Sequence, residues 1–330
     1  MKILITGAAG FIGYNLAKRL IAKHTVVGID NVNDYYSVQL KKDRLKDLKH
    51  KNFTFHKIDL KDAKAINKLF NKYKFDCVFN FAAQAGVLYS TKYPRYYLDS
   101  NTNGFFNIIE ACEKTNVPKV FYASSSSVYG NVKKFPVSET SALSPENYYG
   151  LTKKHNEEVA EVFSRFTKIQ FIGLRFFTVY GPWGRPDMVI YKMIDSIFNK
   201  TKFYMNNNGN HYRDFTHIDD LTDILQKLLT TQTGKKNIVF NLCTQKPIKL
   251  TTIQNILESQ CSTMLTDSKI NLVSRGFQQG DVLKSHGSNK MLTKCIGKHK
   301  FISIEKGLDS CINWFNDYHR GGYVWKTKQY

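Results

Sequence analysis

Tyr149 and Lys153, a tyrosine and a lysine four positions apart, are suited to acid–base chemistry. Residues at i and i+4 share one face of a helix. The Lys153 ammonium can therefore stand beside the Tyr149 phenol and favour its deprotonated form. A serine cluster at 124–127 closes an expected strand, and a hydroxyl there can donate to the same substrate oxygen. The pattern predicts proton removal from an alcohol by a tyrosine base. Tyr148 is a rival phenol, but Thr152 lies four residues on and brings no charge.

A glycine-rich turn, Gly7-x-x-Gly10-x-x-Gly13, follows the first apolar run and opens an expected helix. Glycines there permit a tight turn, the approach of backbone N–H groups to a pyrophosphate, and close helix packing. Asp30 ends the second β-branched run, where a carboxylate accepts from a ribose 2′-OH and repels a 2′-phosphate. We therefore predict bound NAD in preference to NADP. The other predicted cofactor contacts are Phe11, Ile12, Asn31, Asn33, Asp59, Leu60, Ala82, Ala83, Gln84, Asn101, Ser124, Tyr149 and Lys153.

The elements that position these residues alternate between strand and helix. Strands are expected at Lys2 to Thr6, Thr25 to Ile29, Phe53 to Ile58, Cys77 to Phe81, Lys119 to Ala123 and Ile169 to Phe176. Helices are expected at Phe11 to Ala22, Lys61 to Tyr73, Pro94 to Thr115 and Tyr149 to Phe166. This alternation predicts an α/β fold with a Rossmann-type doubly wound parallel sheet. Ligands on such sheets bind at the carboxyl ends of the strands, where the notable residues fall.

The second half of the chain is less regular. Gly181 to Arg213 is rich in Gly, Pro and Asn and is expected to form loops around one helix, Met188 to Asn199. Asn237 to Leu242 is expected to be a strand that rejoins the main sheet, and short helices are expected near Thr251 to Ser259 and Ile304 to Tyr318. The predicted domains are an NAD-binding Rossmann domain at 1–178, joined by 214–245, and a smaller mixed α/β substrate domain at 179–213 and 246–330.

Composition excludes several classes of protein. The chain has 330 residues with 42% hydrophobic content, enough for a large core. Its 48 Lys and Arg against 27 Asp and Glu are spread along the chain, which favours a solvated basic surface over nucleic-acid binding. No apolar run approaches the roughly 20 residues of a membrane span. The six cysteines are scattered, unlike those of disulfide scaffolds or zinc sites. We expect a cytoplasmic protein without a metal or a membrane segment.

Longer stretches of the sequence resemble the extended short-chain dehydrogenase/reductase family and, within it, the UDP-glucuronate 4-epimerases. The stretches are residues 30–41 with Arg44 and Leu45, Ala82 to Val87, Ser124 to Gly130, Leu174 to Met188, Arg213 to Thr216 and Ile218 to Asp220. The similarity runs from the N-terminus to about Asp281. Two positions differ: Leu88 stands where those epimerases usually carry Arg, and Gln279 where they usually carry Pro.

The resemblance implies reversible, NAD-dependent C4 epimerisation of UDP-glucuronate to UDP-galacturonate through a 4-keto sugar, for polysaccharide or glycan synthesis. It implies three catalytic residues: Tyr149 takes the 4-hydroxyl proton, Ser125 hydrogen-bonds the same oxygen, and Lys153 lowers the phenol pKa and holds the nicotinamide ribose. The implied substrate contacts are Ser126, Ser127, Thr178, Arg185, Met188, Arg213 and Asp281.

Alternative activities remain open. The substrate could be another UDP-sugar, of the UDP-glucose or UDP-N-acetylglucosamine type. Related dehydratases and decarboxylases carry acidic residues just after the catalytic hydroxyl, where this chain has Ser126 and Ser127, which cannot serve as carboxylate bases. A non-catalytic NAD-binding regulator is a further alternative, although it would need no tyrosine base.

The chain is also expected to form a homodimer. Helices Pro94 to Thr115 and Tyr149 to Phe166 are expected to lie side by side on one face of the sheet. Apolar residues on their outer surfaces should pair with a second copy in a four-helix contact, as the resemblance also implies. The residues expected on that surface are Phe105, Phe106, Ile109, Val159 and Val162.

Overall fold

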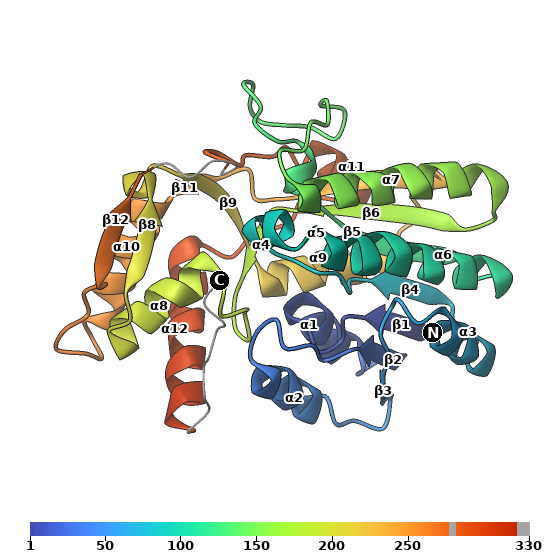
Figure 1. Ribbon diagram of the computed structural model, residues 1–330, viewed down its shortest axis with the longest axis horizontal. Helices are drawn as coiled ribbons and strands as arrows, with labels where there is room; N and C mark the ends of the chain where they lie inside the picture. The colour runs from blue at the N-terminus through green and yellow to red at the C-terminus, as the bar shows by residue number, and fades with distance from the viewer. Residues whose placement is uncertain (277–281, 322–330) are drawn as a thin grey trace.

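A seven-stranded parallel sheet forms the larger part of the molecule (Figure 1). The structure is a computed structural model and describes residues 1–276 and 282–321. The strand order is β10-β6-β5-β4-β1-β2-β3. The strands are β1 (Lys2–Thr6), β2 (Thr25–Asp30), β3 (Phe53–Lys57), β4 (Cys77–Asn80), β5 (Lys119–Ser125), β6 (Gln170–Phe176) and β10 (Asn237–Leu242). The doubly wound fold predicted from the sequence is confirmed. Because the chain runs outward in both directions from β1 and β4, a ligand is expected above that pair.

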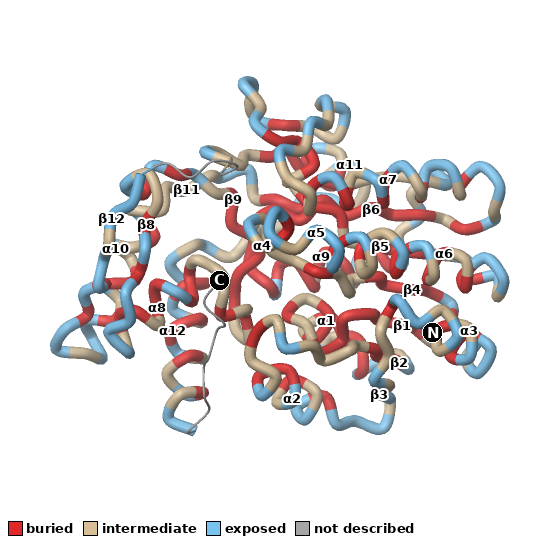
Figure 2. Tube along the Cα trace, viewed as in Figure 1, coloured by how far each residue is buried: buried red, intermediate tan, exposed pale blue. Residues whose placement is uncertain are grey.

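Helices cover both faces of this sheet. Successive strand residues point to opposite faces, so Ile3 and Ile5 belong to one core and Leu4 to another. The first core is closed by α1 (Phe11–Leu20) and α9 (Ile218–Thr230), and the second by α3 (Ala63–Lys72), α6 (Gly104–Lys114) and α7 (Tyr148–Phe166). Figure 2 shows the strands between these layers as mostly buried. The buried layers fix the strand ends that carry the site.

The helix expected from Pro94 to Thr115 consists of three segments. They are α5 (Pro94–Tyr97), a π-helical segment (Leu98–Asn103) and α6. Phe105 and Ile109 are buried in the core beneath α6, so the prediction that they face outward is wrong. Phe105 and Ile109 lie four residues apart and share the face of α6 that packs on the sheet. Phe106 and Val162 are exposed, whereas Val159 packs partly against the core.

The second part of the chain packs beside the sheet around its own core, which contains Tyr191, Leu257 and Phe315 (Figure 1). Its helices are α8 (Val189–Asn199), α10 (Leu250–Cys261) and α12 (Ile304–Arg320). A small sheet has the order β11 (Pro247–Lys249), β9 (Tyr212–His217) and β7 (Thr178–Tyr180), and β8 (Phe203–Asn206) pairs with β12 (Leu272–Arg275). The predicted domain limits remain a prediction.

Several elements were not predicted. They are α2 (Val38–Asp47), α4 (Val87–Lys92), α9, α11 (Lys290–Ile296) and the strands of the second part. The stretch expected to be loops around α8 also contains β8, whose pairing partner β12 lies more than 60 residues further along the chain. No helix within residues 1–276 and 282–321 has the length and apolar character needed to cross a membrane.

Candidate active site

A cleft of about 1240 Å³ extends over the carboxyl ends of the strands and is lined by both parts of the chain. It exceeds the roughly 300–1,000 Å³ of a typical pocket for one small molecule, so it has room for two ligands side by side. Among the described residues, every predicted catalytic, cofactor and substrate residue lines this cleft except Asn101. Asp281 lies outside the described residues.

The glycine-rich turn forms one end of the cleft. Gly7 has a φ of +73°, and a Cβ there would lie 2.9 Å from the backbone nitrogen of Ala82. A Cβ on Gly13 would lie 2.2 Å from the carbonyl oxygen of Gly7. Both positions therefore exclude a side chain, which keeps the turn open for a close ligand at the start of α1.

The Asp30 carboxylate lies beside this turn. Its Oδ2 accepts a hydrogen bond from the Ala9 amide at 3.2 Å, and its Oδ1 accepts one from the Val32 amide at 2.7 Å. Asn31 donates to Asp59 Oδ2 at 3.0 Å and so joins the ends of β2 and β3. A glycine cradle with a carboxylate at the next strand end fits a dinucleotide with a free ribose 2′-OH.

Asn101 is buried behind the cleft and hydrogen-bonds to two neighbouring segments, and its predicted contact with the cofactor remains a prediction. It is 1% exposed and does not line the cleft. Its Oδ1 accepts from the Gln84 amide at 2.7 Å, and its Nδ2 donates to the Gln84 carbonyl oxygen and to Thr152 Oγ1. Asn101 thus ties the π-helical segment to the loop after β4 and to α7, which carries Tyr149.

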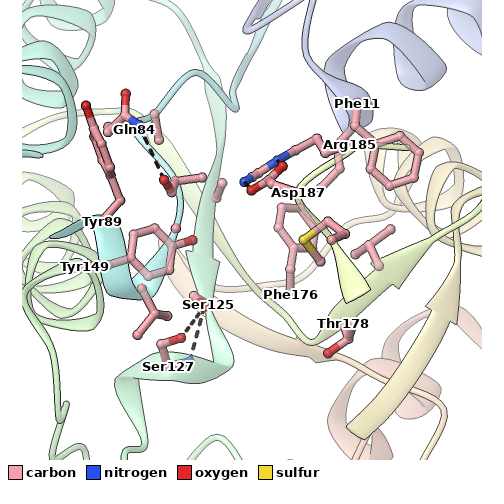
Figure 3. A pocket seen from close by; sticks show the side chains of 18 of the residues that line it. Phe11, Gln84, Tyr89, Ser125, Ser127, Tyr149, Phe176, Thr178, Arg185 and Asp187 are labelled. Atoms are coloured by element: carbon pink, nitrogen blue, oxygen red, sulfur yellow. Dashed lines mark hydrogen bonds and ion pairs between the residues drawn. The ribbon is translucent and has the colours of Figure 1, made fainter. Parts of the chain in front are cut away.

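The three predicted catalytic residues are brought together at the end of β5 and the start of α7. Asn147 caps α7 by accepting from the Gly150 amide at 2.8 Å, so the helix begins with Tyr148 and Tyr149. Lys153 follows one turn later, and its Nζ lies 5.8 Å from the centre of the Tyr149 ring. Figure 3 shows Tyr149 and Ser125 on the same side of the pocket.

Burial and polar neighbours act in opposite directions on the Tyr149 phenol, and its pKa is raised overall. Burial raises the pKa of Tyr149, whereas its hydrogen bond with Ser125 and the charge of Arg185 lower it. Burial lowers the pKa of Lys153 to about 8. Ser125 Oγ donates to Ser127 Oγ at 3.2 Å and accepts from the Ser127 amide at 3.1 Å. The cleft therefore holds a base, a nearby cation and a hydroxyl donor in one place.

Ser124 lines the cleft, but its hydroxyl donates to Glu157 Oε1. Glu157 is also held by Arg175, whose Nε and Nη2 donate to its two oxygens at 2.9 and 2.7 Å. This ion pair is buried under α7. The Ser124 side chain therefore supports α7, and only its backbone is available for the predicted cofactor contact.

Arg185 lies on the opposite side of the pocket from Tyr149, paired with Asp187 (Figure 3). The pairing is bidentate, with Nε donating to Oδ1 at 2.9 Å and Nη2 to Oδ2. Burial acts against the charged guanidinium, but Asp187 holds the pKa of Arg185 above its usual range. The sequence did not predict this ion pair. It reduces the net charge that Arg185 offers to a diphosphate.

The chain matches the model of the NAD dependent epimerase/dehydratase family over residues 3–243. The protein belongs to this family. Membership confirms the predicted extended short-chain dehydrogenase/reductase family and NAD as its cofactor.

Individual relatives are similar over nearly the whole chain. Protein CapI from Staphylococcus aureus is 38% identical over 338 residues, covering 97% of this chain and 100% of that protein. UDP-glucuronate 4-epimerase 4 from Arabidopsis thaliana is 36% identical, and the match covers 97% of this chain and 76% of that protein. A solved structure of the UDP-glucuronic acid 4-epimerase from Bacillus cereus, in complex with UDP-glucuronic acid and NAD, is similar with a TM-score of 0.89 and 28% identity. The match covers 96% of this chain and 99% of that one.

In this family member, sequence reasoning missed a set of basic residues that line the cleft. They are Lys41, Lys192, Lys202, Arg275 and Lys284. No motif connects them, because they come from α2, α8, β12 and loops far apart in the chain. The excess of Lys and Arg was a signal for anionic ligands, but it could not say which cations face the cleft.

Proposed function

We propose that this family member is an NAD-dependent UDP-sugar 4-epimerase that converts UDP-glucuronate reversibly to UDP-galacturonate. The observation that carries the proposal is the grouping of Ser125, Tyr149 and Lys153 in a cleft that also contains the glycine turn. The curated names of relatives and the ligands of the Bacillus cereus structure support this substrate.

The chain's own groups carry the proton transfers. Tyr149, as phenolate, takes the proton of the 4-hydroxyl, while Ser125 donates a hydrogen bond to the same oxygen. Lys153 favours the phenolate by its charge and also holds the nicotinamide ribose. When bound, NAD accepts the hydride from C4 and returns it to the opposite face of the 4-keto sugar. The net redox change is zero, so the cofactor has no reason to leave between turnovers.

The diphosphate of the substrate is placed among the cations of the second part. Arg213 and Arg275 both line the cleft there, and guanidinium groups match phosphate oxygens in geometry. Arg185 joins them with part of its charge already balanced by Asp187. Met188 lines the same region.

The carboxylate of the sugar is held by hydroxyl groups. Ser126 and Ser127 lie in the helical turn that follows β5, and Thr178 begins β7. All three line the cleft. The 4-keto form of a uronic acid is a β-keto acid, which loses CO2 when its carboxylate aligns with the carbonyl. Hydroxyl donors can hold the carboxylate out of that alignment, and Ser126 and Ser127 supply no carboxylate base for dehydration.

Leu88 favours a second candidate substrate. It lines the cleft and is 52% exposed, where UDP-glucuronate 4-epimerases usually carry Arg. An apolar side chain at this place suits a neutral sugar, so the second candidate substrate is UDP-glucose.

We also propose a cytoplasmic homodimer. The π-helical segment, α6 and α7 carry five exposed apolar residues: Leu98, Phe106, Leu151, Val162 and Phe166. The Phe106 ring lies 5.7 Å from that of Phe163, which places α6 against α7. A second copy covering these exposed residues would bury a four-helix contact.

A panel of UDP-sugars tests the substrate. The purified protein should be incubated with UDP-glucuronate, UDP-glucose and UDP-N-acetylglucosamine without added NAD, and the products resolved by chromatography. The proposal expects inversion of UDP-glucuronate well above the other two. Faster inversion of UDP-glucose would select the runner-up, and a pentose product would select decarboxylation.

A further inference from the structure

Arg44 of α2 is a fully buried cation outside the described catalytic group. It has 0% exposure and does not line the cleft. Its two terminal nitrogens donate to four neutral oxygens, three of them backbone carbonyls. Its Nε makes no hydrogen bond to the part of the chain that the structure describes. Burying a guanidinium against neutral acceptors alone costs free energy of folding. A side chain kept there at such a cost points to a role beyond stability.

Its hydrogen bonds join two segments that are distant in the sequence. Nη1 donates to the carbonyl oxygen of Ala9 at 2.9 Å, and Nη2 donates to those of Trp183 at 2.6 Å and Gly184 at 3.1 Å. Ala9 lies in the glycine-rich turn, and Trp183 and Gly184 immediately precede Arg185. One guanidinium therefore bonds both the cofactor turn and the loop that carries a cleft cation.

The backbone of Trp183 shows that this loop is under constraint. Its φ of 63° lies in the left-handed region, which is unfavourable for a bulky side chain. Such a conformation persists only where the surroundings hold it. The Trp183 ring packs 5.2 Å from Tyr14, and its carbonyl accepts the shortest of the Arg44 bonds. The same ring also packs against Trp314 at 5.3 Å and Tyr318 at 5.7 Å. Arg44 is thus the hydrogen-bonding contact among several that hold the loop.

Tyr36 completes the link. Its hydroxyl accepts from Arg44 Nη1 at 2.7 Å, and its ring lies 6.0 Å from the Arg185 guanidinium. Lys41 lies 4.4 Å from the same ring and lines the cleft. The hydrogen bonds of Arg44 therefore hold the loop that carries Arg185 at a fixed position relative to the cofactor turn.

We propose that Arg44 is a positioning residue that couples the cofactor site to the nucleotide-sugar site. The inference rests on the proposed function only in requiring NAD at the turn and a UDP group near Arg185. A ligand that orders the loop at 183–185 also restrains the glycine-rich turn through Arg44. Bound UDP should therefore slow the release of NAD, and bound NAD should raise the affinity for UDP. Such coupling is reciprocal and typically changes affinity about 5- to 150-fold.

The test measures release of NAD from the purified holoenzyme, with and without saturating UDP. In the wild type, UDP should slow release at least about fivefold. Arg44→Lys keeps the charge, but a single ammonium cannot hold both segments, so the slowing should fall to less than twofold. Arg44→Gln, a second variant, should likewise show less than twofold slowing of NAD release by UDP. Both should start with a full complement of NAD, bind UDP more weakly and retain kcat within about threefold at saturating substrate.

Arg19→Met is the matched control. Arg19 also makes four hydrogen bonds, from α1 to α9, but it does not line the cleft and bonds neither segment. This variant should lose stability and keep the full effect of UDP. The inference is overturned if the wild type binds UDP without any change in NAD release, or if both Arg44 variants keep the wild-type slowing. A wild type that fails to bind UDP would instead contradict the proposed function.

Discussion

Lys153 Nζ lies 5.8 Å from the centre of the Tyr149 ring, one helical turn further along α7, and is almost wholly buried. Because burial lowers the pKa of this ammonium to about 8, its charge is present below that pH and is lost above it. The Tyr149 phenol loses this neighbouring charge in the same pH range. This relationship gives the site a specific pH dependence.

Turnover should fall as the pH rises through about 8, since deprotonated Lys153 no longer favours the Tyr149 phenolate. The measurement is kcat for UDP-glucuronate between pH 6 and about 10, where the ordinary Lys value lies. Lys154→Met is the control, because the neighbouring Lys154 pairs with Glu158 and does not line the cleft. That variant should keep the wild-type profile. A wild-type rate that stays level to pH 10 would refute the role given to Lys153.

Tyr149→Phe should lower kcat by about 10²- to 10⁴-fold, because it removes the general base. Bound NAD should stay unchanged, as the glycine turn is untouched. Tyr148→Phe removes the adjacent phenol, which does not line the cleft, and should retain activity within about twofold. Comparable losses in the two variants would show that the proton is taken by another group.

Much of the cofactor end could be predicted from sequence because its signals are local. Gly7, Gly10 and Gly13 follow a strand and open a helix within one short stretch, and Asp30 ends the next strand. Tyr149 and Lys153 share a helix face by spacing alone. Such features need no knowledge of the rest of the fold.

Other features depend on partners distant in the sequence. Phe106 of α6 is exposed as predicted, but Phe105 and Ile109 are buried, because only the folded chain shows which face of α6 packs on the sheet. Arg185 was expected to face a diphosphate, but only the folded chain shows the geometry of its pair with Asp187. Asn101 was predicted to contact the cofactor, and only the folded chain shows its hydrogen bonds to Gln84 and Thr152.

Asp30→Ala should weaken the retention of NAD, since the predicted acceptor for the ribose 2′-OH is lost. The measurement is the NAD released from denatured protein after extensive dialysis, which should drop to less than half of the wild-type amount. Asp62→Ala is a suitable control, because Asp62 caps α3 through the Ala65 amide at 3.0 Å and lies outside the cleft. It should cost about 1 kcal/mol of stability and keep its NAD. Release of NADP from the wild type would contradict the role of Asp30 as the acceptor that selects a free ribose 2′-OH.

Thr178→Val should lower activity on UDP-glucuronate roughly tenfold, in line with the loss of one hydrogen bond to a charged group. It should also raise the share of decarboxylated pentose product, because the carboxylate is held less firmly. Product chromatography measures both effects. The NAD content should not change. Full activity with no pentose would show that Thr178 only packs in β7.

Val162→Glu should convert the dimer to a monomer, because it places a charge in the proposed four-helix contact. Light scattering at micromolar concentration measures the mass. Met264→Glu is the control, since Met264 is exposed to a similar extent, 45% against 48%, but follows α10 in the second part. It should remain dimeric. A wild type with the mass of one chain would contradict the assembly.

The most direct test follows the hydrogen at C4. UDP-glucuronate labelled with deuterium at C4 should be incubated in ordinary water with the protein as purified, and the product examined by NMR. The proposal predicts UDP-galacturonate that keeps the deuterium at C4, because Tyr149 and Ser125 handle only the hydroxyl proton and the hydride is borrowed and returned. Loss of the label to water, or no UDP-galacturonate at all, would contradict it.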